Sequence, residues 1–201
     1  VFKPAPIQRK WREDGTCRLI YVSVYYPHKV PHIVCQATDQ LNRIGINSHA
    51  TITMAPTEFD EMRGSDLDSL IVNDAAERGI VSLGHYKYKD LPDLYRSQDV
   101  FIFPSVSETF GHPMAEAMSS GLPVIAADTP VNREICGDAA LYFEPFSVAE
   151  LTNCIRQLDQ DEKLRLSLPE IGRQRALEKF DWDDHVDRLV ETMEKTVRGK
   201  A

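Results

Sequence analysis

The stretch DVFIFPSVSETFGHPMAEAMSSGLPVIAAD, residues 99–128, decides the fold. Two runs rich in β-branched and aromatic residues, 99–105 and 122–127, flank a loop and a helical segment at 113–120. Pro113 suits the first position of that helix, and Gly121 suits the position just after its end. The order strand, loop, helix, strand predicts one unit of a parallel sheet covered by helices.

The same alternation continues on both sides of this stretch, from near residue 17 to residue 145. Most of the apolar runs are unbroken, which is typical of strands buried on both faces of a parallel sheet. The pattern therefore predicts an α/β fold, a doubly wound (Rossmann-like) parallel sheet of about six strands. We expect strands at 18–26, 49–55, 79–84, 99–105, 122–127 and 140–145, and helices at about 30–44, 66–78, 91–98 and 113–120.

From residue 146 onward the pattern is helical only. Ser147 and Glu150 have the spacing of a capping box at the start of a helix over 147–158. Two charged amphipathic segments follow, at about 161–179 and at about 182–197, and Pro169 interrupts the first. We expect both to pack on the sheet. No linker divides the chain. We therefore expect a single domain over 1–201, with a lead-in at 1–16, the sheet core at 17–145 and C-terminal helices at 146–201.

Charge and composition exclude some classes of protein. The net charge of −8 argues against a protein that coats nucleic acid. No apolar run approaches the roughly 20 residues of a membrane span, and the start of the chain lacks the apolar centre of a signal peptide. The cysteines are too widely spaced for a zinc site or a disulfide framework, which favours inert packing residues in a reducing cytoplasm. They are Cys17, Cys35, Cys136 and Cys154.

The loop at 105–112 follows a strand of the predicted sheet, and ligands of such sheets bind at the carboxyl ends of the strands. Gly111 allows close backbone approach, and the amides that open the next helix form an anion site suited to phosphate. Glu116 is the one charged residue of an otherwise apolar or small-residue helix, so it either lies on a solvated strip or points into a polar pocket. The helix dipole alone would favour Glu116 without any ligand, and Glu108 reads equally as a solvated loop residue.

Residues 99–128 resemble the donor-nucleotide lobe of the GT-B glycosyltransferases, and among them the retaining family 4 enzymes (glycosyl transferases group 1). The Glu-x7-Glu signature of that family matches Glu108 and Glu116, and Phe110, Gly111 and Pro113 are also in place. The similarity extends to VSLGHYKYKDLPDLYRSQDV at 81–100, REICGDAALYFEP at 133–145 and FDWDDHVDRLVE at 180–191. It covers most of the chain.

The resemblance implies a role for each matching position. Glu108 would contact hydroxyls of the donor sugar, and Glu116 would hold the ribose hydroxyls, since a carboxylate offers several acceptor sites and no competing donor. Lys29 and Glu108 are the expected catalytic groups. The backbone around Phe110, Gly111 and His112, with Pro113 and Met114 in the first helical turn, would meet the sugar and diphosphate, and the loop Gly84-His85-Tyr86 would border the base.

One position departs from the family. A Gly-Arg pair usually ends the first strand, and a lysine that also binds the diphosphate follows five residues after the arginine. Here Ser23 and Val24 stand at the positions of the Gly-Arg pair, whereas the lysine is present as Lys29. The lost contact would be worth about 1.5–3 kcal/mol. Three other cations are candidates to replace it, although a solvated surface role is the preferred interpretation of each, and they are His28, His32 and Arg133.

Two further patterns have simpler explanations. The sequences DLD at 66–68 and DWD at 181–183 match a metal-binding pattern of a different glycosyltransferase fold, but each opens a predicted helix, where Asp is favoured as a cap. We expect no metal and no cofactor beyond the nucleotide sugar itself. His85 and His112 read as loop residues that line the site rather than as proton-transfer catalysts.

The resemblance implies the donor-binding domain of a retaining glycosyltransferase, which moves a sugar from a nucleotide diphosphate sugar to a glycan or a lipid-linked saccharide. An N-terminal acceptor-binding lobe would be missing, so the chain by itself would be inactive, and it would not bind nucleic acid. A cytoplasmic location is expected, with peripheral membrane association at the inner face for the full-length enzyme only. The alternatives are a non-catalytic nucleotide-sugar-binding or assembly module, favoured by Val24, and an epimerase or phosphorylase of the same fold.

Overall fold

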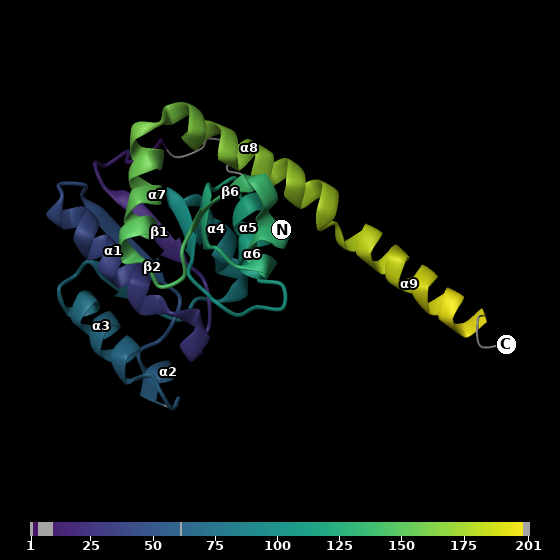
Figure 1. The fold of residues 1–201 in the computed structure, drawn as a ribbon, viewed down its shortest axis with the longest axis horizontal. Coiled ribbons are helices and arrows are strands. Elements are labelled where there is room, and N and C mark those ends of the chain that lie inside the picture. Colours follow the sequence, from purple (N-terminus) through teal and green to yellow (C-terminus); the bar gives the residue numbers. More distant parts are fainter. Residues whose placement is uncertain (1, 4–9, 61, 199–201) are drawn as a thin grey trace.

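The structure, a computed structural model, describes residues 2–3, 10–60 and 62–198, so part of the predicted lead-in, residues 1 and 4–9, lies outside the described residues. At its centre is a sheet of six parallel strands in the spatial order β3-β2-β1-β4-β5-β6 (Figure 1). The predicted doubly wound parallel sheet is confirmed. The strands are β1 (Cys17–Tyr21), β2 (Ser48–Ile52), β3 (Val81–Leu83), β4 (Val100–Phe103), β5 (Val124–Ala127) and β6 (Ala140–Phe143).

The order of the strands reverses at the middle of the sheet. The chain adds β2 and β3 on one side of β1, then returns to place β4 on the other side, where Leu19 pairs with Val100 and Ile20 with Phe101. The loops that leave β1 and β4 therefore lead in opposite directions. In sheets of this kind the resulting crevice at the carboxyl ends of the strands is where ligands bind.

The strands are shorter than the apolar runs that predicted them. β1 ends at Tyr21, although the run continues to residue 26. The amide of Tyr25 donates to Glu58 Oε2 at 2.8 Å instead of to a neighbouring strand, and its ring packs on Phe59 with centroids 4.4 Å apart. Apolar residues beyond a strand end thus belong to loops that are packed on the core.

Helices surround the sheet, and those predicted up to residue 120 are all present. α1, α3 and α7 form one group in contact, and α5 contacts α6 and α8. The helices are α1 (Pro31–Arg43), α2 (Thr57–Asp60), α3 (Asp66–Glu77), α4 (Leu91–Arg96), α5 (His112–Ser119), α6 (Pro130–Cys136), α7 (Val148–Gln160), α8 (Glu162–Lys179) and α9 (Trp182–Arg198), with 3-10 turns η1 (Pro27–Lys29), η2 (Tyr88–Asp90) and η3 (Gly137–Ala139).

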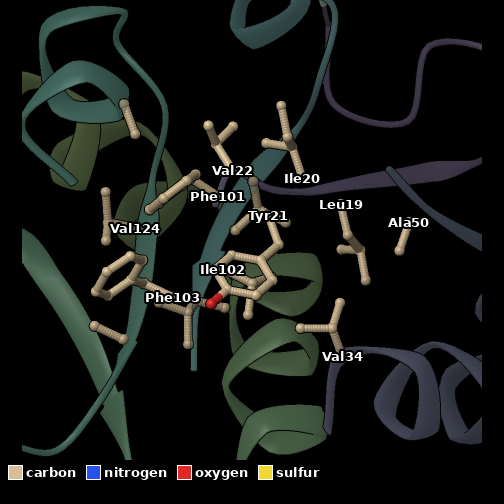
Figure 2. Packing of buried hydrophobic residues seen from close by; sticks show 14 of the residues in the cluster. Leu19, Ile20, Tyr21, Val22, Val34, Ala50, Phe101, Ile102, Phe103 and Val124 are labelled. Atoms are coloured by element: carbon tan, nitrogen blue, oxygen red, sulfur yellow. The ribbon is translucent and has the colours of Figure 1, made fainter. Parts of the chain in front are cut away.

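The core lies between the sheet and these helices (Figure 2). Large aromatic side chains of the two central strands fill it: the rings of Tyr21 and Phe103 meet edge to face with centroids 6.1 Å apart, and Phe101 stacks on Phe103. All four cysteines are buried, as predicted for packing residues. Burial raises the pKa of Cys154 to about 11, and such a thiol stays protonated and unreactive at neutral pH.

Two local predictions needed correction. Helix α6 was not predicted, although Thr129 accepts a hydrogen bond from the amide of Asn132 and Pro130 opens the helix, which are ordinary start signals. The capping box at α7 is half right. Ser147 Oγ accepts from the amide of Glu150, whereas the Glu150 carboxylate accepts from the amide of Glu144 at 2.7 Å.

The predicted interruption of the first charged helix at Pro169 is wrong, because α8 runs unbroken through it. A proline inside a helix removes one backbone hydrogen bond. Close packing of α8 on α5 offsets that loss: a Cβ on Gly172 would lie 3.1 Å from Met118 Cγ, so the absence of a side chain lets the two helices approach.

The expectation that the last helix packs on the sheet is also wrong. α9 projects away from the rest of the chain as an extension beyond α8 (Figure 1), and every side chain described in it is exposed. Its apolar residues share one face and are between 46% and 72% exposed; they are Val186, Leu189, Val190, Met193 and Val197. Across the described residues, no helix combines the length and the apolar content that a membrane crossing requires.

Candidate functional site

The two groups predicted to be catalytic meet at the reversal point of the sheet. Lys29 closes the turn η1 after β1, and Glu108 lies in the loop after β4. Lys29 Nζ is 2.5 Å from Glu108 Oε1, and the two side chains are only 13% and 11% exposed. An ion pair this far from water is screened much less than a surface pair. The structure therefore brings the predicted cation and carboxylate together.

The backbone holds this ion pair in place from both sides. The amide of Val106 donates to the carbonyl of His28 at 3.0 Å, and Ser105 Oγ donates to the same carbonyl at 3.3 Å. The buried Tyr21 hydroxyl donates to the carbonyl of Lys29 at 2.8 Å. The loop after β1 is thus fastened to the loop after β4 within one or two residues of each charged side chain.

The start of α5 lies three residues beyond Glu108. Gly111 caps the helix with φ at +81°, and a Cβ there would lie 2.6 Å from Met114 Cε and 3.3 Å from the Phe103 ring. Only glycine fits both the conformation and the space. The amides of Gly111 and His112 donate no hydrogen bond to any described residue. Free amides at the start of a helix are the groups that bind phosphate.

Glu116 points from α5 toward α4. Its Oε2 accepts a 3.0 Å hydrogen bond from the hydroxyl of Tyr95, whose ring is fully buried. Burial raises the pKa of Glu116, and the hydrogen bond from Tyr95 and the charge of His112 oppose that rise. The carboxylate is thus half-buried and hydrogen-bonded rather than fully solvated, and its role toward a nucleotide stays a prediction.

Other predicted site residues present their main chain, rather than their side chain, to the candidate site. Met114 is buried in the core, with its sulfur 3.4 Å from Cys136 Sγ, so only its main chain faces the start of α5. Pro113 has no amide hydrogen to donate. Phe110 packs its ring on Phe180 and His112, with centroids 5.3 Å and 4.8 Å away.

Two further groups of predicted residues lie at the carboxyl ends of β3 and β1. Gly84 follows β3, its amide donates to the carbonyl of Ile52, and His85 and Tyr86 come next in the same loop. Ser23 is held after β1 by a 3.0 Å bond from its amide to Thr53 Oγ1. Val24, where the family has arginine, is 54% exposed. Their roles toward a nucleotide stay predictions.

Two of the candidate replacement cations are engaged elsewhere. Arg133 forms a double contact with Asp128, including Nη2 to Oδ2 at 2.6 Å, and lies over the Tyr142 ring at 4.4 Å. His28 stacks on Tyr26 with centroids 5.6 Å apart, and burial and the charge of Lys29 lower its pKa. A histidine with a lowered pKa is mostly neutral at pH 7, so it is a poor substitute for arginine.

The third candidate belongs to a buried cluster that the sequence analysis did not find. His32 Nδ1 lies 2.5 Å from Asp68 Oδ1, and the Tyr25 hydroxyl donates to Asp68 Oδ2 at 2.7 Å. Asp68 is the last residue of the DLD pattern, and each of its carboxylate oxygens has one of these two side chains as a partner. Nothing in the sequence links positions 25, 32 and 68, because they are brought together by the packing of α1 and of the loop after β1 against α3.

The other acidic pattern is a helix cap. Asp181 Oδ1 accepts from the amides of Asp183 and Asp184 at 2.9 and 3.3 Å, which satisfies the start of α9. In residues 2–3, 10–60 and 62–198, no three or more His, Cys, Asp or Glu side chains gather in a way that would hold a metal ion.

A surface hollow of about 560 Å³ lies at the opposite edge of the sheet, where β4 and β5 begin. α8 forms one wall, and the lining includes Trp11, Arg96, Ser120, Leu122, Arg165 and Arg173. None of the predicted site residues lines it. The candidate site is therefore defined by the charged groups and the helix terminus at the carboxyl edge, and not by this hollow.

Comparisons with known proteins match most of the chain to one family. Residues 6–175 match the family described as glycosyl transferases group 1. The chain is 36% identical over 185 residues to O-antigen chain mannosyltransferase B of Escherichia coli, covering 89% of this chain and 46% of that protein. The chain thus spans about half the length of this curated relative.

Two solved structures share the fold. The C-terminal domain of the glycosyl transferase group 1 family protein LpcC from Francisella tularensis has a TM-score of 0.70 at 23% identity, covering 90% of this chain and 97% of that domain. Anabaena HepE, solved in complex with UDP, has a TM-score of 0.77 at 21% identity, covering 92% of this chain and 51% of HepE.

Proposed function

The chain belongs to the glycosyl transferases group 1 family, and on that premise we propose that it is the donor-binding lobe of a retaining glycosyltransferase that uses a nucleotide diphosphate sugar. The observation that carries this proposal is the meeting of Lys29, Glu108 and the unoccupied amides at the start of α5 on one edge of the sheet. One cation, one carboxylate and one helix terminus match the diphosphate, the sugar hydroxyls and the phosphate oxygens of such a donor.

Each group has a distinct part in the proposed reaction. The ammonium of Lys29 and the amides of Gly111 and His112 stabilise the negative charge that develops on the leaving diphosphate. Glu108 accepts hydrogen bonds from sugar hydroxyls and so orients the sugar for transfer. Glu116 holds the ribose hydroxyls, and the loop at 84–86 borders the base. We propose neither a metal nor an organic cofactor.

The proposal includes a second lobe that carries the acceptor. The chain covers only 46% of the mannosyltransferase that it resembles. In addition, α9 exposes the apolar face formed by Val186, Leu189, Val190, Met193 and Val197, and a contiguous exposed apolar face of this kind marks a surface that packs on a partner. We propose that α9 packs on the acceptor lobe, that this chain alone binds donor without turnover, and that the acceptor is a glycan or lipid-linked saccharide at the inner face of the cytoplasmic membrane.

Calorimetric titration of this chain with UDP-glucose, GDP-mannose and ADP-glucose tests the proposal. We expect one of the three to bind, and Lys29→Ala and Glu116→Ala each to weaken that binding about tenfold or more, since each removes a contact to a charged group. Glu191→Ala, which removes an exposed ion pair with Lys195 within α9, is the control and leaves binding unchanged. The absence of binding by all three sugars at millimolar concentration would refute the proposal.

The exposed Val24 favours a second candidate, a binding or assembly module that has lost transfer activity. Such a module would bind the nucleotide sugar equally well. Sugar transfer by the longer protein that contains this chain distinguishes the two candidates. In an enzyme, Glu108→Ala abolishes transfer; in a module, there is no transfer for the substitution to change.

A further inference from the structure

The contact between Lys29 and Glu108 raises a question about the donor site in its unliganded form. The two groups assigned to the donor already neutralise each other at 2.5 Å, and both are nearly buried. Lys29 Nζ and the Glu108 carboxylate have no other hydrogen-bond partner among the described residues. Removing one member of such a pair leaves a buried charge without a partner, which is strongly unfavourable.

A diphosphate that recruits Lys29 creates this situation. The ammonium turns from Glu108 toward the phosphate oxygens, and Glu108 is left next to a second anion. The backbone hydrogen bond between Val106 and His28 holds the two loops together, so the carboxylate stays largely shielded from water. The ribose hydroxyls are assigned to Glu116, so the donors that remain for Glu108 are the hydroxyls of the transferred sugar.

We propose that the Lys29–Glu108 ion pair makes the lobe discriminate between a nucleotide diphosphate sugar and the nucleotide diphosphate that remains after transfer. This inference rests on the proposed function. The intact donor supplies both a diphosphate for Lys29 and hydroxyls for Glu108. The sugar-free product supplies only the first, so it competes with Glu108 for Lys29 at a net cost and is released more readily. Glu108 is thus a specificity-determining residue as well as a sugar contact.

Removing the carboxylate tests the inference, because the inference predicts that the affinities for the nucleotide diphosphate and for the nucleotide sugar change in opposite directions. The probes are the pairs UDP with UDP-glucose, GDP with GDP-mannose, and ADP with ADP-glucose, and the pair that wild-type protein binds is used throughout. In Glu108→Gln, we expect the nucleotide diphosphate to bind about fivefold tighter and the nucleotide sugar about tenfold weaker, on the scale of one charged hydrogen bond. Glu108→Ala is expected to show the same pattern, which guards against a variant that fails to fold.

Two comparisons exclude simpler explanations. Asp128→Asn removes a carboxylate from the same edge of the sheet, but one that pairs with Arg133, and it should change both affinities by the same factor. In a Lys29→Gln background the effect of Glu108→Gln on the nucleotide diphosphate should vanish, because there is no longer a cation to compete for. If that effect persists in full, the carboxylate acts by simple repulsion and the inference is wrong.

The possible outcomes distinguish a failure of the inference from a failure of the proposed function. Wild-type protein that binds none of the six probes contradicts the proposed function. Wild-type protein that binds a pair, with Glu108→Gln weakening both ligands or leaving the nucleotide diphosphate unchanged, overturns the inference and leaves the donor site intact. Opposite shifts that depend on Lys29 support it.

Discussion

The hydroxyl of Tyr95, on α4, donates a 3.0 Å hydrogen bond to Glu116 Oε2, on α5. The tyrosine is fully buried, whereas the glutamate is only half-buried, so the fixed partner orients the carboxylate and not the reverse. Neither residue is near the other in sequence. A carboxylate aimed in advance loses less conformational freedom when a ligand binds.

Replacement of Tyr95 by Phe removes this hydroxyl and keeps the ring. We expect nucleotide-sugar affinity to fall about three- to tenfold, as for the loss of one hydrogen bond that orients a charged group. Tyr142→Phe is the matched control. It also removes a partly buried hydroxyl that donates a hydrogen bond, here to the carbonyl of Gly137, but it lies outside the site. Calorimetry on both variants measures the effect, and equal affinities in the two would contradict the positioning role of Tyr95.

The raised pKa of Glu116 predicts how stability depends on pH. Folding favours the neutral form, so the stability from this group is present below its ordinary pKa of 4.5 and is lost as pH rises through the raised value. Glu116→Gln is neutral at every pH. It should unfold at higher urea concentration than wild type at pH 7, and the difference should disappear below pH 4.5. Glu108→Gln, which breaks the ion pair with Lys29, should be less stable than wild type at pH 7.

Gly111 should tolerate no side chain. Gly111→Ala combines a left-handed backbone with a Cβ only 2.6 Å from Met114 Cε, so we expect a loss of about 2–4 kcal/mol in the free energy of unfolding. Gly45→Ala has a similar φ of +86° but open space around the new Cβ, and should cost about 1 kcal/mol. Equal costs in urea unfolding would show that crowding at Gly111 is unimportant.

Introducing the missing cation should strengthen the site. Val24→Arg places a guanidinium on an exposed position of the loop after β1, and we expect nucleotide diphosphate to bind about tenfold tighter, for one added contact to phosphate. Ile44→Arg adds the same charge at an exposed position beyond the far end of α1 and should have no effect. An unchanged affinity in Val24→Arg would place Val24 away from the phosphates.

α9 should contribute nothing to the stability of this chain. Its described side chains are exposed, and an isolated helix of this length is marginal in water. Deletion of residues 183–201 should change the melting temperature by less than about 2 °C. A deletion that begins at 161 also removes α8, whose Leu168 and Ala176 are buried, and should lower it severely. A large loss in the shorter deletion would mean that α9 packs on this lobe.

The sequence predicted the sheet well because buried parallel strands leave a local mark. Each run of β-branched and aromatic residues became a strand, and Pro113 and Gly111 mark the start of α5. The ends of the strands were harder to predict, because the side chain of Glu58 takes up the amide of Tyr25 where a ladder would otherwise continue. Local patterns do not report such long-range partners.

The candidate site also has parts that the sequence predicts and parts that it does not. Glu108, Glu116 and Lys29 were found from their spacing and family resemblance, but their partners in space were not. The hydrogen bond of Tyr95 to Glu116 and the cluster around Asp68 depend on how α4 meets α5 and how α1 meets α3. The prediction that the last helix packs on the sheet failed because its apolar face gives the same pattern whichever surface covers it.

The position of β1 beside β4 also has a consequence for folding kinetics. Lys29 and Glu108 sit on opposite sides of the seam between the first three strands and the last three, and that seam pairs residues some 80 positions apart, Leu19 with Val100 and Ile20 with Phe101. Contacts of such long range form late, since the chain between them must be ordered first. We therefore expect nucleotide binding to appear only after the two halves of the sheet have docked.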